Sequence, residues 1–350
     1  MAQGGGGGMR FVVAFDGSDL SSLALRATIQ VFARDGDELL VYHVSNVGRW
    51  PPGEGLQALE LDALHDRLAS ELCDVSHLRV LRRSTTGELQ DCASPASGSP
   101  VNGSQLMTVE EKGDAEARKI SKRIVAFAAA HVADVLVMGS TGAKGDASTS
   151  YQRTMLGSSA HLAAFEAPCS VALVRPGCRV EPKLATVYMV AVDGSQHALH
   201  ALRLAAEWAR PNKDEIVCRV FGPPEFTVSV EESCTSELQE LMHLKKVEYS
   251  VIPTELAESA DEHGDELAET ASMCRFRQQA FLVFGARGRG SETSPTSASP
   301  ASMPASPSFG ADSPKSVVMP GSSTTLGKVA RWCTFEAQCS IIIARPRVVI

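Results

Sequence analysis

Short runs of consecutive apolar residues recur along the chain and alternate with segments in which apolar residues fall three and four positions apart. Continuous apolar runs are typical of strands buried on both faces of a parallel sheet. The spaced segments place their apolar side chains on one helical face, as in Leu20, Leu23, Ala24 and Ala27. The predicted strands are Phe11–Phe15, Leu39–Val44, Leu78–Leu81, Val135–Met138, Val171–Val174, Val187–Val192, Ile216–Val220, Val247–Ile252, Phe281–Phe284 and Ile341–Ala344.

This pattern occurs twice. The stretch VVAFDGS from Val12 matches MVAVDGS from Met189, LVMGSTG matches LVFGARG, and FEAPCS matches FEAQCS, in the same order. Two copies of one domain explain the match, each with five parallel strands and helices on both faces, a doubly wound α/β fold. We predict a flexible Gly-rich tail at 1–9, a first domain at 10–176, a linker at 177–185 and a second domain at 186–346.

Two segments do not fit a compact domain, about 92–113 and about 291–325. Both are rich in Ser and Pro and poor in large apolar residues, so we expect disordered surface insertions. They carry Ser-Pro dipeptides that suit proline-directed kinases, although such dipeptides are also common in any disordered tract. The serines concerned are Ser94, Ser99, Ser294, Ser299, Ser306 and Ser313.

Composition narrows the function classes. The 350-residue chain has a net charge of −8 and no basic run, which argues against a nucleic-acid partner. No apolar stretch approaches the ~20 residues of a membrane span, and the N-terminus lacks the apolar core of a signal peptide. Nine scattered cysteines without a CxxC pair favour reduced thiols in the cytoplasm and no metal site, and we expect Cys169 and Cys339 to be buried as small hydrophobic residues.

Three segments would converge beyond the carboxyl ends of the first domain's strands if the first and fourth strands are neighbours. Asp16 could accept hydrogen bonds from ribose or adenine, or either Asp16 or Ser18 could simply cap the following helix. The glycines of Gly139–Gly142 would let the backbone approach a phosphate closely. The helix that begins at Gly157–Ser159 offers free N–H groups and a dipole that favours an anion, or a plain serine cap.

Catalytic motifs are missing from the sequence. We find no nucleophile elbow, no P-loop ending in GK[ST], no HExxH and no paired-carboxylate pattern. The sequence therefore favours a protein that binds a nucleotide over one that turns it over, and it indicates no catalytic residues. A slow ATPase stays open as an alternative. So does an interaction module of the same fold that binds no nucleotide and recruits partners through its insertions.

Both copies resemble universal stress protein domains through VVAFDGS, DVLVMGSTG and LGSSAHLAAFEAPCSVALVRP. The resemblance implies a Rossmann-like fold of the adenine nucleotide alpha hydrolase type, which binds ATP or a related adenine nucleotide, with or without Mg²⁺. It implies that adenosine contacts Ala14, Asp16 and Val44, and that the phosphates lie on Gly139, Gly142, Gly157, Ser158 and Ser159. The family pattern has nine residues between its second and third glycines, whereas fourteen separate Gly142 from Gly157 here.

The second copy departs further from that family pattern. Asp193, Gly285 and Gly288 match, but 38 residues intervene before Gly327, and Lys328 stands where the hydroxyl should be. We therefore expect a weaker second site at these residues. The resemblance implies a stress-response role as a nucleotide-responsive regulator. We also expect the two domains to pack as an intramolecular pseudo-dimer through their fifth strands, which would otherwise be exposed apolar edges.

Overall fold

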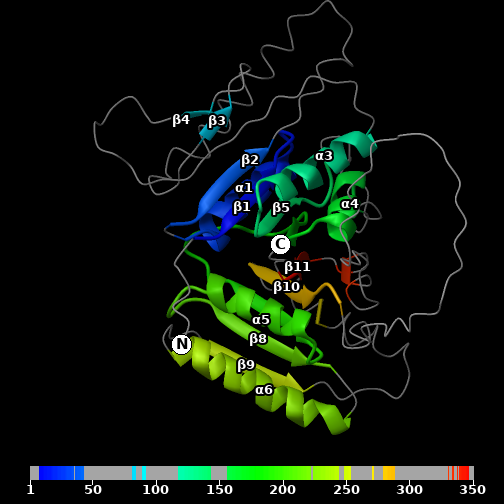
Figure 1. The fold of residues 1–350 in the computed structure, drawn as a ribbon. Helices are drawn as coiled ribbons and strands as arrows, with labels where there is room; N and C mark the ends of the chain where they lie inside the picture. The colour runs from blue at the N-terminus through cyan, green and yellow to red at the C-terminus, as the bar shows by residue number, and fades with distance from the viewer. Residues whose placement is uncertain are drawn as a thin grey trace, which may run out of the picture.

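The computed structural model describes residues 8–34, 36–42, 81–83, 89–91, 117–142, 156–221, 224–243, 248–253, 270–271, 279–287, 330, 333–334, 337 and 339–346 (Figure 1). The Ser-Pro serines, Val44, Gly288, Gly327 and Lys328 lie outside these residues, as do the two predicted insertions. We call residues up to 176 the first half of the chain and the remainder the second half.

The described strands and helices alternate along each half. The first half contains β1 (Arg10–Ala14), α1 (Asp19–Ala27), a π-helical turn η1 (Thr28–Phe32), β2 (Glu38–Tyr42), β3 (Leu81–Arg83), β4 (Leu89–Asp91), α3 (Ala117–Ala130), β5 (Val135–Gly139), α4 (Ser158–Glu166) and β6 (Ser170–Val174). The second half contains β7 (Val187–Val192), α5 (Gln196–Trp208), β8 (Glu215–Val220), α6 (Pro224–His243), β9 (Glu248–Pro253), β10 (Ala280–Gly285) and β11 (Ser340–Ala344).

One continuous sheet joins nine of the described strands, in the order β2-β1-β5-β6-β11-β10-β7-β8-β9. Pairing is parallel within each half. The two halves meet where β6 and β11 pair antiparallel, with Ala172 opposite Ile342. The predicted doubly wound α/β fold is therefore confirmed. Because the junction is antiparallel, the carboxyl ends of the strands lie at opposite edges of the sheet in the two halves.

Helices cover both faces of this sheet, as the continuous apolar strands predicted. In the strands of the main sheet from β2 to β8, alternate residues enter two separate hydrophobic clusters. One cluster packs α1, α5 and α6 against residues such as Phe11 and Val13, and the other packs α3 and α4 against residues such as Val12 and Leu136. Cys169 and Cys339 are buried next to β6 and β11, as predicted, and neither forms a disulfide with a described residue. Burial raises the pKa of the Cys169 thiol to about 12.

The third predicted strand of the first half differs from expectation. Of Leu78–Leu81 only Leu81 is described, and it begins β3, which pairs antiparallel with β4 in a separate two-stranded sheet. Among the described strands, the first half thus contributes four to the main sheet instead of five. The physical reason lies in the side chains, since LRR and LQD carry too many polar residues to be buried on both faces.

The halves also share packed side chains beyond the strand junction. The Phe32 ring lies 4.6 Å from Trp208 and 5.0 Å from Phe281, both in the second half. The Arg34 guanidinium donates to the Trp208 carbonyl, and the indole N–H of Trp208 lies 3.3 Å from the Met9 sulfur. These contacts belong to a core that continues from the first half to the second, and the cluster on the other face also contains residues of both halves.

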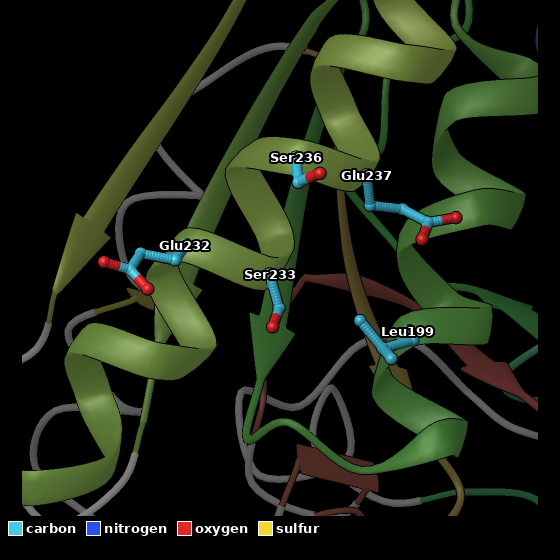
Figure 2. Close-up of a pocket in the computed structure, with 5 residues that line it drawn as sticks. All are labelled: Leu199, Glu232, Ser233, Ser236 and Glu237. Carbon is cyan, nitrogen blue, oxygen red and sulfur yellow. The ribbon is translucent and has the colours of Figure 1, made fainter.

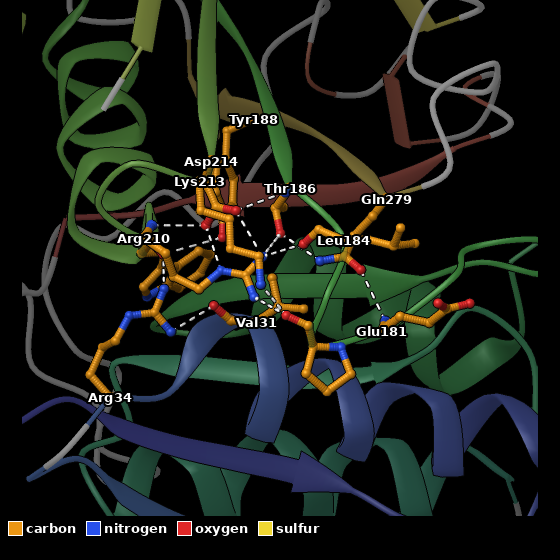
Figure 3. A network of polar contacts seen from close by, with 12 residues as sticks. Val31, Arg34, Glu181, Leu184, Thr186, Tyr188, Arg210, Lys213, Asp214 and Gln279 are labelled. Carbon is orange, nitrogen blue, oxygen red and sulfur yellow. Dashed lines mark hydrogen bonds and ion pairs between the residues drawn. The ribbon is translucent and has the colours of Figure 1, made fainter. Parts of the chain in front are cut away.

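A buried ion pair holds the segment that connects β6 to β7 (Figure 3). Arg210 donates to the Asp214 carboxylate at 2.7 Å, and it also donates to the Leu184 carbonyl and the Thr186 hydroxyl. Asp214 is 2% exposed and accepts the Thr186 backbone N–H at 2.8 Å. Gln279, just before β10, adds a bond to the Thr186 hydroxyl. The connecting segment is thus tied to the second half by charged and polar contacts.

Candidate functional site

The strand order reverses between β1 and β5, because β1 pairs with β2 on its other side and β5 continues to β6. Val13 of β1 lies beside Val137 of β5 in parallel register. The chain therefore leaves both strands at the same edge of the sheet, with Asp16 after β1 and Ser140 after β5. In open α/β sheets this switch point is where ligands bind.

Asp16 follows the buried end of β1, where Ala14 is 8% exposed, and its own side chain is exposed. Its carboxylate accepts the Ser18 N–H at 3.0 Å. Ser18 is the residue that caps α1, since its hydroxyl accepts the Ser21 N–H at 3.2 Å. Gly17 between them has a φ of +80°, a conformation that favours glycine. The capping role considered for Asp16 thus belongs to Ser18, and the Asp16 carboxylate faces solvent.

The glycine loop after β5 lies directly against Asp16. A Cβ atom on Gly142 would come within 2.8 Å of Asp16 Oδ2, so this position has room only for glycine while the carboxylate stays in place. A Cβ atom on Gly139 would lie 2.9 Å from Leu20 Cβ, which gives that glycine a packing role against α1. The loop is held to the sheet because Ser140 N–H donates to the Val174 carbonyl at 2.8 Å.

Helix α4 begins beside the same loop. The Gly157 N–H donates to the Ser140 carbonyl at 2.8 Å, and Gly157 is the N-cap without a side-chain hydrogen bond. By contrast, α1 and α5 are capped by serine hydroxyls. Ser158 is exposed, whereas the half-buried Ser159 shares a 3.0 Å hydrogen bond with Ser121 of α3, in which either hydroxyl can donate. The first N–H groups of α4 have no intrahelical partner and can donate hydrogen bonds to an anion.

Ser140 is a site residue that the sequence prediction did not single out. Its hydroxyl is buried, with the residue 1% exposed, and it has no hydrogen-bond partner in the part of the chain that the structure describes. A buried hydroxyl usually has a partner, so a ligand oxygen in the loop would suit it. Comparing the two copies could have pointed to this serine. The first copy has Ser140 in GSTG, where the second copy has alanine in GARG.

The second half repeats part of this geometry. Asp193 accepts the Ser195 N–H at 3.0 Å, and Ala286 N–H donates to the Ala344 carbonyl at 2.9 Å. Here the Ser195 hydroxyl donates to the Arg287 carbonyl, and a Cβ atom on Gly285 would lie 2.6 Å from the His197 backbone. Gly285 is therefore needed for close packing against α5. Gly288, Gly327 and Lys328 fall outside the described residues, so the weaker site stays a prediction.

An open hollow lies away from these loops, between α5 and α6 (Figure 2). Its lining is Leu199, Glu232, Ser233, Ser236 and Glu237. Two carboxylates and no cation make this hollow a poor receptor for a phosphate. Within the described ranges we find no cluster of three metal-binding side chains. Among the described helices, none combines the length and apolar character that a membrane span requires.

The switch point in the first half therefore offers a ligand both a hydrogen-bond acceptor and several donors. An exposed carboxylate at Asp16 can accept hydrogen bonds from hydroxyl or amino groups. A few ångströms away, the glycine loop and the uncapped start of α4 present N–H donors, and the Ser140 hydroxyl adds another. This combination suits a ligand with hydroxyls at one end and an anion at the other.

Comparisons with known proteins concern the family and the fold. Residues 9–175 match the model of the universal stress protein family. A universal stress protein from Archaeoglobus fulgidus is 12% identical, with a TM-score of 0.53, over 97% of this chain and 98% of that one. A candidate universal stress protein from Pseudomonas aeruginosa is 14% identical, with a TM-score of 0.50, over 97% and 93%. These two likenesses show the fold alone.

A universal stress protein solved in complex with cAMP is 20% identical, with a TM-score of 0.27, over 48% of this chain and 96% of that one. Among curated proteins, none matches the chain.

Proposed function

We propose that this chain, whose residues 9–175 match the universal stress protein family, binds ATP or a related adenine nucleotide in its first half. The observation that carries the proposal is the meeting of three separate segments at one switch point: Asp16, the loop Gly139–Gly142, and the start of α4 at Gly157. Each segment alone has a structural explanation. Their contact is what favours a nucleotide site.

In this proposal the nucleotide lies with its sugar toward β1 and its phosphates toward α4. The Asp16 carboxylate accepts hydrogen bonds from ribose hydroxyls, and Ala14, with the predicted contact Val44, borders the adenosine. The phosphate oxygens accept hydrogen bonds from the backbone N–H of Gly142. They also accept hydrogen bonds from the N–H groups of Ser158 and Ser159 in the first turn of α4. The Ser140 hydroxyl donates to a phosphate oxygen. Mg²⁺, where present, would be held by the phosphates themselves.

We propose a nucleotide-responsive regulator in preference to an enzyme. The sequence has no nucleophile elbow, no P-loop ending in GK[ST], no HExxH and no paired-carboxylate pattern. The competing function is a nucleotide-free interaction module, which the packing roles of Gly139 and Gly285 favour because they explain those glycines without a ligand.

The proposal is tested by titrating the full chain with ATP and following the heat of binding and the unfolding temperature. A ligand that binds only the folded state stabilises it by about 2.7 kcal/mol at a hundred times its Kd. We expect such a stabilisation in the wild type. We expect it to be lost in Gly142→Ala combined with Ser158→Ala, because the new methyl group displaces the Asp16 carboxylate.

Val228→Ala is the control, because this side chain is 61% exposed on α6 of the second half and lies outside the three segments of the proposed site. This variant should retain the response to ATP. A wild-type protein that shows neither heat nor a temperature shift at millimolar ATP would favour the interaction module. ADP or AMP formed above a protein-free control, and lost in the double variant, would instead favour the slow ATPase.

We also propose that the two halves act as an intramolecular pseudo-dimer, with binding mainly in the first. The antiparallel pairing of β6 with β11 and the shared core around Trp208 support this assignment. The second half, with its long insertion near the matching loop, would then serve chiefly as the structural partner of the first. Kinases acting at the Ser-Pro serines remain part of the proposal as regulators.

A further inference from the structure

Two arginines follow the last strands of the two halves, Arg175 after β6 and Arg345 after β11. They occupy matching positions, since both stand directly before a proline at the end of the repeated segment. Each arginine reaches across the β6–β11 junction into the other half. The backbone N–H of Arg175 donates to the Ser340 hydroxyl at 3.0 Å, and that of Arg345 donates to the Ser170 hydroxyl at 3.1 Å.

Their guanidinium groups make equivalent contacts with the helices that lead into these strands. Arg175 donates to the Thr334 carbonyl at 2.6 Å, in the helical segment before β11. Arg345 donates to the Ala164 carbonyl in α4 and, at 3.4 Å, to the Cys169 carbonyl. The exchange is reciprocal, as in a twofold-symmetric interface. A residue of the second half therefore holds a helix of the first half.

The helix held by Arg345 is the one that begins at the proposed phosphate site. Ala164 lies in the last turn of α4, where carbonyl groups lack intrahelical partners and a cation is favourable. The nine residues of α4 make it about 13 Å long, with Gly157 at one end and the Arg345 contact at the other. At the start, the Gly157 N–H is bonded to the Ser140 carbonyl of the glycine loop. Both ends of the helix are thus fixed, one of them by the second half.

Arg345 is also connected to the glycine loop of its own half. The preceding residue, Ala344, accepts the Ala286 N–H at 2.9 Å. Burial and the nearby charge of Arg287 lower the pKa of Arg345 to about 10, although it stays charged at neutral pH. Helix α4 therefore extends from the loop of the first half to a cation beside the loop of the second.

We propose that Arg345 is a positioning residue for the nucleotide site of the first half, through which the second half sets the affinity for phosphate. The inference rests on the proposed function. Arg345 fixes the C-terminal end of α4, and because α4 is short and rigid, its N–H groups are thereby aimed at the phosphates. Adenosine alone, which contacts β1 and not α4, binds independently of this residue.

The experiment measures the Kd of ATP and of adenosine for the full chain, in the wild type and in Arg345→Gln. We expect ATP to bind about tenfold more weakly, a typical coupling between sites, while the adenosine affinity changes by less than about twofold. Arg345→Lys keeps the charge but lacks the two-pronged donor, so it should restore part of the ATP affinity. If Arg345→Gln does not fold, the ratio of ATP affinity to adenosine affinity is compared between Arg345→Lys and the wild type.

Arg175→Gln is the matched control, since it breaks the equivalent contact to Thr334, which lies in the helical segment before β11 and not in α4. Its ratio of ATP to adenosine affinity should equal that of the wild type. An unchanged ratio in Arg345→Gln, or an equal change in Arg175→Gln, would overturn the positioning role. A merely structural role would lower the unfolding temperature in both variants without moving the ratio.

Amide hydrogen exchange in the ligand-free chain separates this inference from the proposed function. Arg345→Gln should speed exchange within α4 (Ser158–Glu166), and Arg175→Gln should not. If the wild type binds neither ATP nor adenosine, the proposed function fails, whereas the exchange comparison still decides whether Arg345 fixes α4. Exchange in α4 that is the same in Arg345→Gln and in the wild type would overturn the inference.

Discussion

Gly285 ends β10 where the first turn of α5 crosses the strand. A Cβ atom there would lie 2.6 Å from the His197 carbonyl carbon and 2.7 Å from the Ala198 nitrogen. These are backbone atoms inside a helix, which cannot move without shifting α5. We expect Gly285→Ala to lower the free energy of unfolding by about 1–3 kcal/mol, the usual cost of forcing a methyl group into a packed interior.

Gly142→Ala, a glycine-to-alanine change in the loop of the first half, is the comparison variant, and both variants are measured by urea unfolding. The added methyl group would meet only the end of the exposed Asp16 side chain, which can rotate away. Its cost should stay within about 0.5 kcal/mol, as for most surface substitutions. Equal losses in the two variants would show that the close approach of α5 to Gly285 does not limit stability.

The residues of the site differ in how far they could be predicted. Asp16, Gly142 and Gly157 could be grouped from sequence because each directly follows a strand or begins a helix, and the switch-point rule brings such positions together. Ser140 could not, because only the packed structure buries its hydroxyl without a described partner. Nor could the Arg345 contact with Ala164, which joins α4 to the residue after β11, 181 positions later in the chain.

At the scale of elements, the connection from β6 to β7 depends on the Arg210–Asp214 pair. Asp214 is 2% exposed and accepts hydrogen bonds from Arg210 and from the Thr186 N–H. Removing one partner of a buried ion pair leaves the other charge without compensation. We expect Asp214→Ala to lower the free energy of unfolding by about 3–5 kcal/mol, measured by urea denaturation.

An exposed ion pair on neighbouring helices serves as the control. Arg203 of α5 and Glu237 of α6 lie 2.6 Å apart, with side chains 50% and 25% exposed. Solvent screens such pairs, so Glu237→Ala should cost no more than about 1 kcal/mol. Should Asp214→Ala prove as mild as Glu237→Ala, the connecting segment would not depend on this pair.

The elements themselves were largely predictable where apolar residues are consecutive. The predicted strand at Val187–Val192 is confirmed residue for residue as β7, and the strands around it agree to within a residue or two. Leu78–Leu81 is the exception, because its three apolar residues are interrupted by Arg79 and followed by two more arginines. Its only described residue, Leu81, starts a polar hairpin instead. Four residues are too few to distinguish a central strand from a hairpin by pattern.

For the whole molecule, the shared core predicts that the two halves unfold together. Phe32 of the first half packs against Trp208 and Phe281 of the second, all inside one cluster. We expect Phe32→Ala to cost about 3–5 kcal/mol and to shift the transition seen by Trp fluorescence together with that seen by far-UV circular dichroism. Val228→Ala, at a side chain 61% exposed, should change neither transition by more than about 0.5 kcal/mol.

Two separated transitions in the wild type, or a Phe32→Ala variant in which only one signal moves, would show that the halves are independent folding units. Coincident transitions would instead mean that a substitution in either half lowers the stability of both. The proposed nucleotide site would then be sensitive to changes anywhere in the shared core.

The junction between β6 and β11 also has a consequence for synthesis of the chain. Ala172 pairs with Ile342, which the ribosome adds 170 residues later. At about 5–20 residues per second, that interval lasts roughly 10–30 seconds. Throughout it, the apolar strand SVALV has no native neighbour on its outer side and presents a pairing edge to every other nascent chain. A strand order that is favourable in the finished protein thus imposes a waiting time in which the first half is most exposed to aggregation.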